Sequence, residues 1–154
     1  MKNLMAAEAK MNNTNTNVGG WEESMMRTTT LPAVFDKLPS ELQAIICEVY
    51  KKTSAGNKST NIVTTADKLF LFSEVEVDGT TSDVYKDEGT KYPMFTSDST
   101  RVKKLSNGSG SENYWWLRSV LTTNYMYFNT VETNGSVGIS TVGAPKGVAF
   151  GFCI

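Results

Sequence analysis

The chain has 154 residues, of which 40% are hydrophobic and 20% charged, and its net charge is −1 at neutral pH. This length predicts one domain over residues 1–154, and the small net charge gives no electrostatic reason to expect a nucleic-acid partner or an anionic membrane surface. The sequence contains no histidine, which excludes Ser-His-Asp and Cys-His nucleophiles, and no apolar run reaches the roughly 18 residues of a transmembrane helix, so we expect no membrane insertion.

Helices are predicted in the first third of the chain. A polar leader over residues 1–20 should precede a short helix at 21–29, and Pro32 favours a new helical turn at 32–38 because proline fits a first turn. Ser40 and Gln43 have capping-box spacing before a third helix. That helix carries an apolar stripe at helical spacing, formed by Leu42, Ile45, Ile46, Val49 and Tyr50. We expect the third helix to continue through Lys51 and Lys52 and to end at residues 54–57.

The middle of the chain changes to the period of a β-strand. Residues 61–65 are rich in β-branched side chains, residues 68–73 predict a strand buried on both faces, and residues 74–77 alternate as in a strand before a turn at 78–79. Residues 80–113 are mostly Ser, Thr, Asp and Gly and predict a long functional or self-packed loop. Its expected anchors are Tyr85, Tyr92, Phe95 and Leu105.

The last forty residues predict antiparallel strands at 114–120, 125–131, 136–142 and 148–154. The dipeptide Asn134-Gly135 indicates a two-residue type I′ hairpin turn. Trp115 and Trp116 should point to opposite faces of their strand, one into the core and the other under the long loop, and Arg118 should bond nearby carbonyls or, alternatively, bind an anion. Helices gathered early and strands gathered late predict an α+β fold with two or three short helices on a mostly antiparallel sheet.

Few residues suggest a metal or redox site. Cys47 and Cys153 could form a disulfide, but each fits equally well as a buried small apolar residue. Carboxylates alternate at Glu74, Glu76 and Asp78 and recur in the loop at Asp83, Asp87 and Glu88, which makes a hard-cation site conceivable; a solvated charged edge is the favoured explanation because the calcium-loop pattern is missing. We expect no metal and no cofactor.

Several motifs resemble one known family. They are GGWE at 19–22, LPSEL at 38–42, DKLFLFSEVEV at 67–77, YWWLRS at 114–119 and GVAFGFCI at 147–154. The chain resembles, from about residue 11 to 154, a bacterial and phage domain family of undefined function, common in gut Firmicutes, with a C-type-lectin-like fold. That family overlaps the variable proteins of diversity-generating retroelements, in which adenine-directed mutagenesis rewrites a C-terminal stretch.

Two departures from the family's pattern, and one missing lectin motif, qualify what the resemblance implies. Val120 stands where family members often carry proline, and members usually have more strands before the polar loop, which here has only ten residues before it. We therefore expect a domain that lacks upstream strands, or one whose sheet edge is completed by a partner or a second copy. The Glu-Pro-Asn and Gln-Pro-Asp tripeptides of calcium-dependent lectins do not occur, so sugar binding of that kind is not expected.

The resemblance and the residue types together predict ligand recognition by two C-terminal segments, 122–132 and 138–146. Tyrosines and small polar residues are typical of protein-binding surfaces, because tyrosine offers a rigid contact and the small residues adapt. The expected ligand-binding residues are Tyr125, Tyr127, Asn129, Thr130, Glu132, Ser140, Thr141, Ala144 and Lys146. The expected partner is a protein or other macromolecule on a cell surface.

Two other function classes stay open. The first is a structural module of a phage tail or cell-surface protein without a dedicated ligand. The second is an enzyme, since the formylglycine-generating family shares the broader fold, but it would need reactive cysteines in an accessible site, and Cys47 is expected on an apolar helix stripe. We expect no enzyme. An extracellular, cell-surface or virion location is favoured, although no signal peptide is visible.

Overall fold

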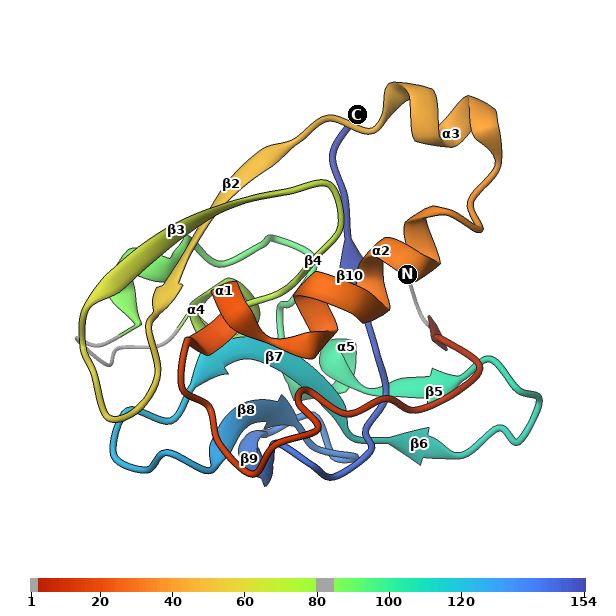
Figure 1. Ribbon diagram of the computed structural model, residues 1–154. Helices are drawn as coiled ribbons and strands as arrows, with labels where there is room; N and C mark the ends of the chain where they lie inside the picture. Colours follow the sequence, from red (N-terminus) through yellow and green to blue (C-terminus); the bar gives the residue numbers. More distant parts are fainter. Residues whose placement is uncertain (1–2, 80–84) are drawn as a thin grey trace.

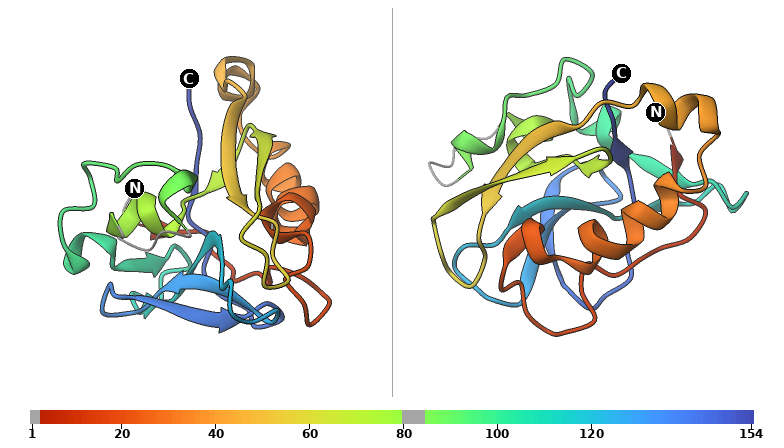
Figure 2. Two further views of the ribbon diagram at one scale, coloured as in Figure 1. Left: turned by 90° about the vertical axis from the view of Figure 1, so that its left-hand side faces the viewer. Right: turned by 45° about the horizontal axis from the view of Figure 1, so that its top comes forward.

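The computed structural model describes residues 3–79 and 85–154, and it has the α+β composition that the sequence predicts. Helices α1, α2 and α3 lie on one side of the molecule and α4 and α5 on the other. The sheet of β7 (Trp115–Val120), β8 (Tyr127–Val131) and β9 (Val137–Thr141) lies at the end opposite α3 (Figures 1 and 2). The described strands form four small sheets, in the orders β1-β5-β6, β10-β4, β2-β3 and β7-β8-β9.

The first helical region is a run of three short helices: α1 (Gly20–Glu23), the π-helix η1 (Met26–Thr30) and α2 (Leu31–Phe35). Ser24 separates α1 from η1 because its backbone is extended, and Pro32 lies in the first turn of α2 as predicted. Trp21 and Met26 are buried, which makes this run the cover of one face of the core.

The predicted third helix is mostly wrong. Helix α3 spans only Ser40–Ile45, with Pro39 rather than Ser40 as its N-cap, and the chain then forms strand β2 (Val49–Ser54). Strand β2 pairs antiparallel with β3 (Ile62–Asp67) over six residue pairs. Only part of the expected apolar stripe packs: Ile46 is in the first core cluster and Leu42 and Val49 lie against it, whereas Ile45 is 53% and Tyr50 79% exposed. Residues 49–54 include β-branched and aromatic side chains and lie beside β3. They form a strand by pairing with it, despite their helical spacing.

The strand predicted at residues 74–77 from their alternating pattern is also wrong. After β4 (Phe70–Leu71), the chain forms helix α4 (Glu74–Asp78). Ser73 and Glu76 make a complete capping box, and Gly79 ends the helix with a positive φ of 72°. These caps select the helix, so the carboxylates of residues 74, 76 and 78 do not lie along one strand face.

The long segment before β7 is partly ordered by short elements: η2 (Lys86–Glu88), α5 (Asp98–Arg101), β5 (Lys103–Leu105) and β6 (Glu112–Asn113). Strand β1 (Asn3–Leu4) runs parallel to β5. Tyr85 and Phe95 are buried anchors, as expected, and Tyr92 and Leu105 pack half-buried against the second core cluster. Asp83 lies outside the described residues.

The C-terminal strands are β7 (Trp115–Val120), β8 (Tyr127–Val131), β9 (Val137–Thr141) and the short β10 (Phe150–Gly151), which pairs with β4. The hairpin at residues 134–135 is confirmed, but its type is not I′, because Gly135 has a φ of 89° while Asn134 has no positive φ. A glycine in the left-handed region is typical of a longer hairpin loop with a bulge.

Strand β7 divides the hydrophobic core into two clusters. Trp116 belongs to the cluster beneath the N-terminal helices, with Met26, Leu31 and Phe128. Trp115 belongs to the other cluster, where its ring stacks on Phe95 at 6.3 Å between centroids. The prediction of opposite faces, with one tryptophan covered by the long loop segment, is confirmed.

The two cysteines are exposed and their thiols are free. The expectation of two buried apolar residues is therefore wrong. Cys47 lies between α3 and β2 rather than on a helix stripe, and Cys153 follows β10.

Candidate functional site

Burial falls steadily across the sheet β7-β8-β9. All six residues of β7 are buried, four of the five residues of β8 are buried, and β9 is half-buried or exposed along its whole length. Strand β7 is one edge of the described sheet, and its outer side is bonded to Gly147 and Phe72. Strand β9 is the other edge. An edge strand presents backbone N–H and C=O groups that no neighbouring strand uses, so this edge is open to a partner.

Most of the predicted ligand-binding residues lie on this outer part of the sheet. Tyr125 and Thr141 are exposed, with Tyr125 at 46%. Half-buried side chains complete the set that has some surface: Tyr127, Glu132, Ser140, Ala144 and Lys146. We call these seven residues, from Tyr125 to Lys146, the outer face.

Asn129 and Thr130 do not belong to the outer face. Asn129 is 2% exposed, and its amide donates to the carboxylate of Glu74 on α4. Thr130 is fully buried opposite Trp116, and its Oγ1 has no hydrogen-bond partner among the described residues. Their side chains are inside the sheet packing, so they cannot contact a ligand in this structure.

The outer face has a compact end and several outlying residues. Tyr127 lies directly opposite Thr141 in the β8-β9 register, and Ala144 N–H donates to the Thr141 carbonyl at 2.9 Å. Glu132 lies at the other end of the hairpin, over Gly138. Lys146 lies apart, with its Nζ 4.6 Å from the ring centroid of Tyr114. The structure therefore brings residues 127, 141 and 144 together. Ser140 is paired with Phe128 and faces the opposite side of the strand from Thr141, and the centroid of the Tyr125 ring lies 5.9 Å from Lys58 Nζ in the β2-β3 turn.

Asn17 fixes the tyrosine end of the outer face, and the sequence analysis missed it. Its buried amide donates to the carbonyls of Asn124 and Tyr127 at 3.0 and 2.9 Å, and its Oδ1 accepts from Asn57 N–H at 2.8 Å. Its own N–H donates to the Tyr125 carbonyl. One side chain thus joins the polar loop, the β2-β3 turn and the segment that enters β8. A polar loop of repeated Asn and Thr gives no local signal that one asparagine is buried.

Beneath the outer face, Arg118 is the centre of a buried polar network. It is fully buried, donates to the Leu71 carbonyl at 2.8 Å and to the Glu88 carbonyl, and pairs with Glu76. Lys51 adds a second ion pair to Glu76 at 3.0 Å, with its Nζ 3.8 Å from the Phe70 ring centroid. The predicted hydrogen bonds of Arg118 to carbonyls are confirmed. Its carboxylate partner, Glu76, was predicted on a solvated edge, and that prediction is wrong because Glu76 is buried.

The two carboxyls of the network differ in pKa. Burial opposes ionisation of Glu76, but the nearby charges of Arg118 and Lys51 outweigh it and hold the pKa of Glu76 below its ordinary value. Burial of Glu88 raises its pKa to about 7, in spite of the Arg118 charge and the bonds from Ser119 Oγ and Ser54 N–H. Glu88 therefore titrates near neutral pH inside the protein.

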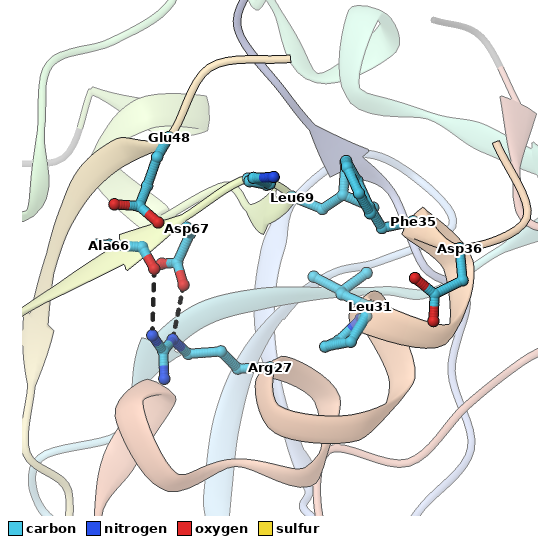
Figure 3. Close-up of a pocket in the computed structure, with 10 residues that line it drawn as sticks. Arg27, Leu31, Phe35, Asp36, Glu48, Ala66, Asp67 and Leu69 are labelled. Carbon is cyan, nitrogen blue, oxygen red and sulfur yellow. Dashed lines mark hydrogen bonds and ion pairs between the residues drawn. The ribbon is translucent and has the colours of Figure 1, made fainter. Parts of the chain in front are cut away.

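A separate pocket of about 270 Å³ lies between α2 and β3. Figure 3 shows the Arg27 guanidinium bonded to Asp67 and the Ala66 carbonyl on one side, and Leu31 and Phe35 on the other. Asp67 also accepts from Trp21 Nε1 at 3.0 Å, so this ion pair is part of the packing of α1 on β3. The pocket lies on the helical side of the molecule and contains none of the predicted ligand-binding residues.

Two further properties concern the described residues, 3–79 and 85–154. No helix among them is long and apolar enough to cross a membrane. No group of three or more potential ligand side chains in these ranges is arranged to hold a metal ion.

Comparison with known proteins identifies the family. A family described as a domain of unknown function, DUF6273, matches residues 1–154. The chain therefore belongs to this family. No curated protein and no solved structure matches the chain. Any function has to be argued from the site itself.

Proposed function

We propose that this member of the DUF6273 family is a ligand-binding protein with a C-type-lectin-like fold whose outer face recognises a macromolecule on a cell surface. The observation that carries the proposal is the fall in burial from β7 to β9 within a single sheet. Side chains on β7 are fixed by packing, whereas those on β9, apart from Val137, which packs against the second core cluster, lie outside both core clusters. A protein that must vary its specificity while keeping its fold needs this separation.

The chemistry of the outer face supports a protein or other macromolecular ligand. Tyr125 and Tyr127 offer rigid amphipathic rings, Ser140 and Thr141 offer hydroxyls, and Lys146 adds a positive charge. The exposed Ile139, at 47%, adds apolar area on the same strand. The edge of β9 can also accept a strand of a partner through backbone hydrogen bonds.

The resemblance to variable proteins of diversity-generating retroelements makes the outer face the expected site of diversification. The genomic test is direct. A reverse transcriptase gene and a near-identical repeat that differs only at adenines should lie near the coding sequence. Absence of both would remove the retroelement part of the proposal and leave general ligand recognition.

The binding test uses the labelled domain on a panel of intact gut bacterial strains, read by flow cytometry. Replacing Tyr125, Tyr127, Thr141 and Lys146 together by alanine should reduce labelling of any recognised strain at least tenfold, since these side chains supply the contacts. A matched variant with alanine at Asn13, Lys37 and Glu41, exposed residues outside the outer face, should keep full labelling. Equal labelling by both variants would reject the site.

A structural module of a phage tail or cell-surface assembly is the second candidate, and the open edge of β9 favours it. In that case the outer face would be buried between subunits. Cross-linking of lysine introduced at Ser140 in the assembled particle would distinguish the two functions. A cross-link to a neighbouring subunit supports the structural module, whereas a free, reactive lysine supports recognition.

The proposal assigns no enzymatic activity to the protein, no cofactor and no metal. The buried carboxyls Glu76 and Glu88 are both bonded within the protein, Glu76 to Arg118 and Lys51 and Glu88 to Ser119 Oγ and Ser54 N–H. Buried and satisfied carboxyls of this kind stabilise a fold rather than act on a substrate.

A further inference from the structure

Cys47 and Cys153 lie opposite each other in the fold, although they are far apart in the sequence. The two residues form an isolated antiparallel β-bridge, and Cys47 N–H donates to the Cys153 carbonyl at 2.9 Å. Figure 1 shows the C-terminal end of the chain beside the segment that leads from α3 into β2. This contact joins the last described residues to the start of the β2-β3 hairpin.

The bridge fixes where the two thiols point. Residues directly opposite each other in an antiparallel pair have side chains on the same side, and a hydrogen-bonded pair has Cα atoms about 5.5 Å apart. Disulfides join Cα atoms that are roughly 4.4–6.8 Å apart and Cβ atoms that are roughly 3.5–4.5 Å apart. The Cα spacing of a hydrogen-bonded pair fits this range, and its Cβ atoms, up to about 5.5 Å apart, have to move closer for the bond to form. Both thiols are exposed and free, so a soluble oxidant can reach them.

We propose that Cys47 and Cys153 are a disulfide-forming modification site that takes a disulfide oxidant such as oxidised glutathione. One cysteine thiolate attacks the oxidant, forms a mixed disulfide and releases one glutathione thiol. The second cysteine thiolate attacks the protein sulfur of that mixed disulfide and releases the second glutathione thiol. Two electrons pass to the oxidant, and the two thiol protons end on the two glutathiones.

The resulting bond would close a loop of roughly one hundred residues and fasten the segment after β10 to the junction of α3 and β2. Phe152 beside one cysteine and Ile46 beside the other both belong to the first core cluster. The disulfide would therefore stabilise the helical side of that cluster. This inference does not rest on the proposed function, since the outer face lies at the other end of the molecule.

The test compares the wild type with a register variant, Cys47→Ser combined with Glu48→Cys. Glu48 is exposed and adjacent to Cys47, and successive side chains of a strand point to opposite faces, so the new thiol should face away from Cys153. Each protein is reduced, equilibrated in glutathione buffers of rising oxidised fraction, alkylated and weighed intact. The wild type should become a monomer that is about 2 Da lighter and carries no alkyl group, whereas the register variant should carry alkyl or glutathione adducts.

Two results would overturn the proposal. The first is closure of the register variant at the same glutathione ratio as the wild type, which would show unspecific collision of the thiols. The second is a wild type that ends as glutathione adducts or disulfide-linked dimers. The melting temperature gives an independent readout. The oxidised wild type should melt about 5–15 °C above its reduced form, and an unchanged melting temperature would contradict a bond formed in the native arrangement.

Discussion

Strands β7 and β9 belong to the same three-stranded sheet, yet their side chains have opposite surroundings. Strand β7 is buried along its whole length. Its one charged residue, Arg118, is bonded to the Leu71 and Glu88 carbonyls and paired with Glu76. Strand β9 is an edge of the sheet and alternates between half-buried and exposed residues. The comparison teaches that one sheet can combine a fully buried strand with one that is half-buried or exposed, with β8 between them.

The largest expected effect is on the interior strand. Arg118→Met should lower the free energy of unfolding by roughly 3–5 kcal/mol, because it leaves the buried Glu76 with Lys51 as its one remaining ion-pair partner among the described residues and removes the donor to the buried Leu71 carbonyl. Urea unfolding at pH 7 measures it. Arg101→Met is the matched control, since the carboxylates that pair with Arg101 are 40% and 62% exposed, and its loss should be about 1 kcal/mol or less. Equal losses of unfolding free energy in the two variants would contradict the claim that the buried Arg118 network on β7 stabilises the fold.

The pH dependence of stability tests the same network. Because the pKa of Glu88 is raised to about 7, the folded protein holds a proton that the unfolded chain releases near 4.5. Stability should therefore fall by roughly 2–3 kcal/mol between pH 5 and pH 8. Glu88→Gln should abolish most of this slope in urea unfolding across that range. A wild-type stability that stays constant from pH 5 to 8 would show that Glu88 is not buried as a proton-binding group.

Asn17 connects the interior to the outer face. Asn17→Ala should cost about 2 kcal/mol, because it leaves the Asn124 and Tyr127 carbonyls and the Asn57 N–H without their bonds. Asn13→Ala in the same polar loop should change the unfolding free energy by less than about 0.5 kcal/mol, since Asn13 is exposed. If the two substitutions had the same effect, the loop would not be holding the tyrosine end of the sheet.

Thr130 in β8 sharpens the boundary between the two regions. Its hydroxyl is buried without a partner among the described residues, so Thr130→Val should leave stability unchanged or raise it by up to about 1 kcal/mol. Thr141→Val, its exposed counterpart on β9, should be neutral. A clear loss of stability in Thr130→Val, measured by thermal unfolding, would reveal a hydrogen bond of that hydroxyl.

The smallest expected effect on stability is at the outer face. Replacing Tyr125, Tyr127, Thr141 and Lys146 together by alanine should lower the free energy of unfolding by no more than about 2 kcal/mol, since none of the four is buried. Circular dichroism and thermal unfolding measure it. A variant that fails to fold would show that these four side chains support the fold. The contrast between a structural β7 and a dispensable outer face would then be wrong.

The sequence predicted strands β7, β8 and β9 well because β-branched and aromatic runs there are bounded by turn residues. Of the strand predicted at 148–154, only Phe150–Gly151 forms a strand. It predicted the helix at 40–52 wrongly because Leu42, Ile45 and Val49 satisfy a helical period, while pairing with β3 decides the conformation of residues 49–54. Helix α4 could have been predicted from its caps, Ser73, Glu76 and Gly79. These caps are stronger evidence for a helix than the alternation of residues 74–77 is for a strand.

For the candidate site, residue type alone could not separate the buried Asn129 and Thr130 from their exposed neighbours. Strand alternation gives two faces, but only the packing of α4 on Asn129 and of Trp116 beside Thr130 shows that both faces of β8 are covered. Asn17 and Glu88 could not be found for a similar reason. Their partners lie at least thirty residues away in the sequence.

The most direct test of the account is a display library in which only Tyr125, Tyr127, Thr141 and Lys146 are randomised, sorted for folded clones and then for labelling of a panel of bacterial strains. The account predicts that most clones fold and that different folded clones label different strains, because these positions determine specificity without supporting the core. Folded clones that all label the same strains as the wild type would contradict the claim that the outer face carries recognition.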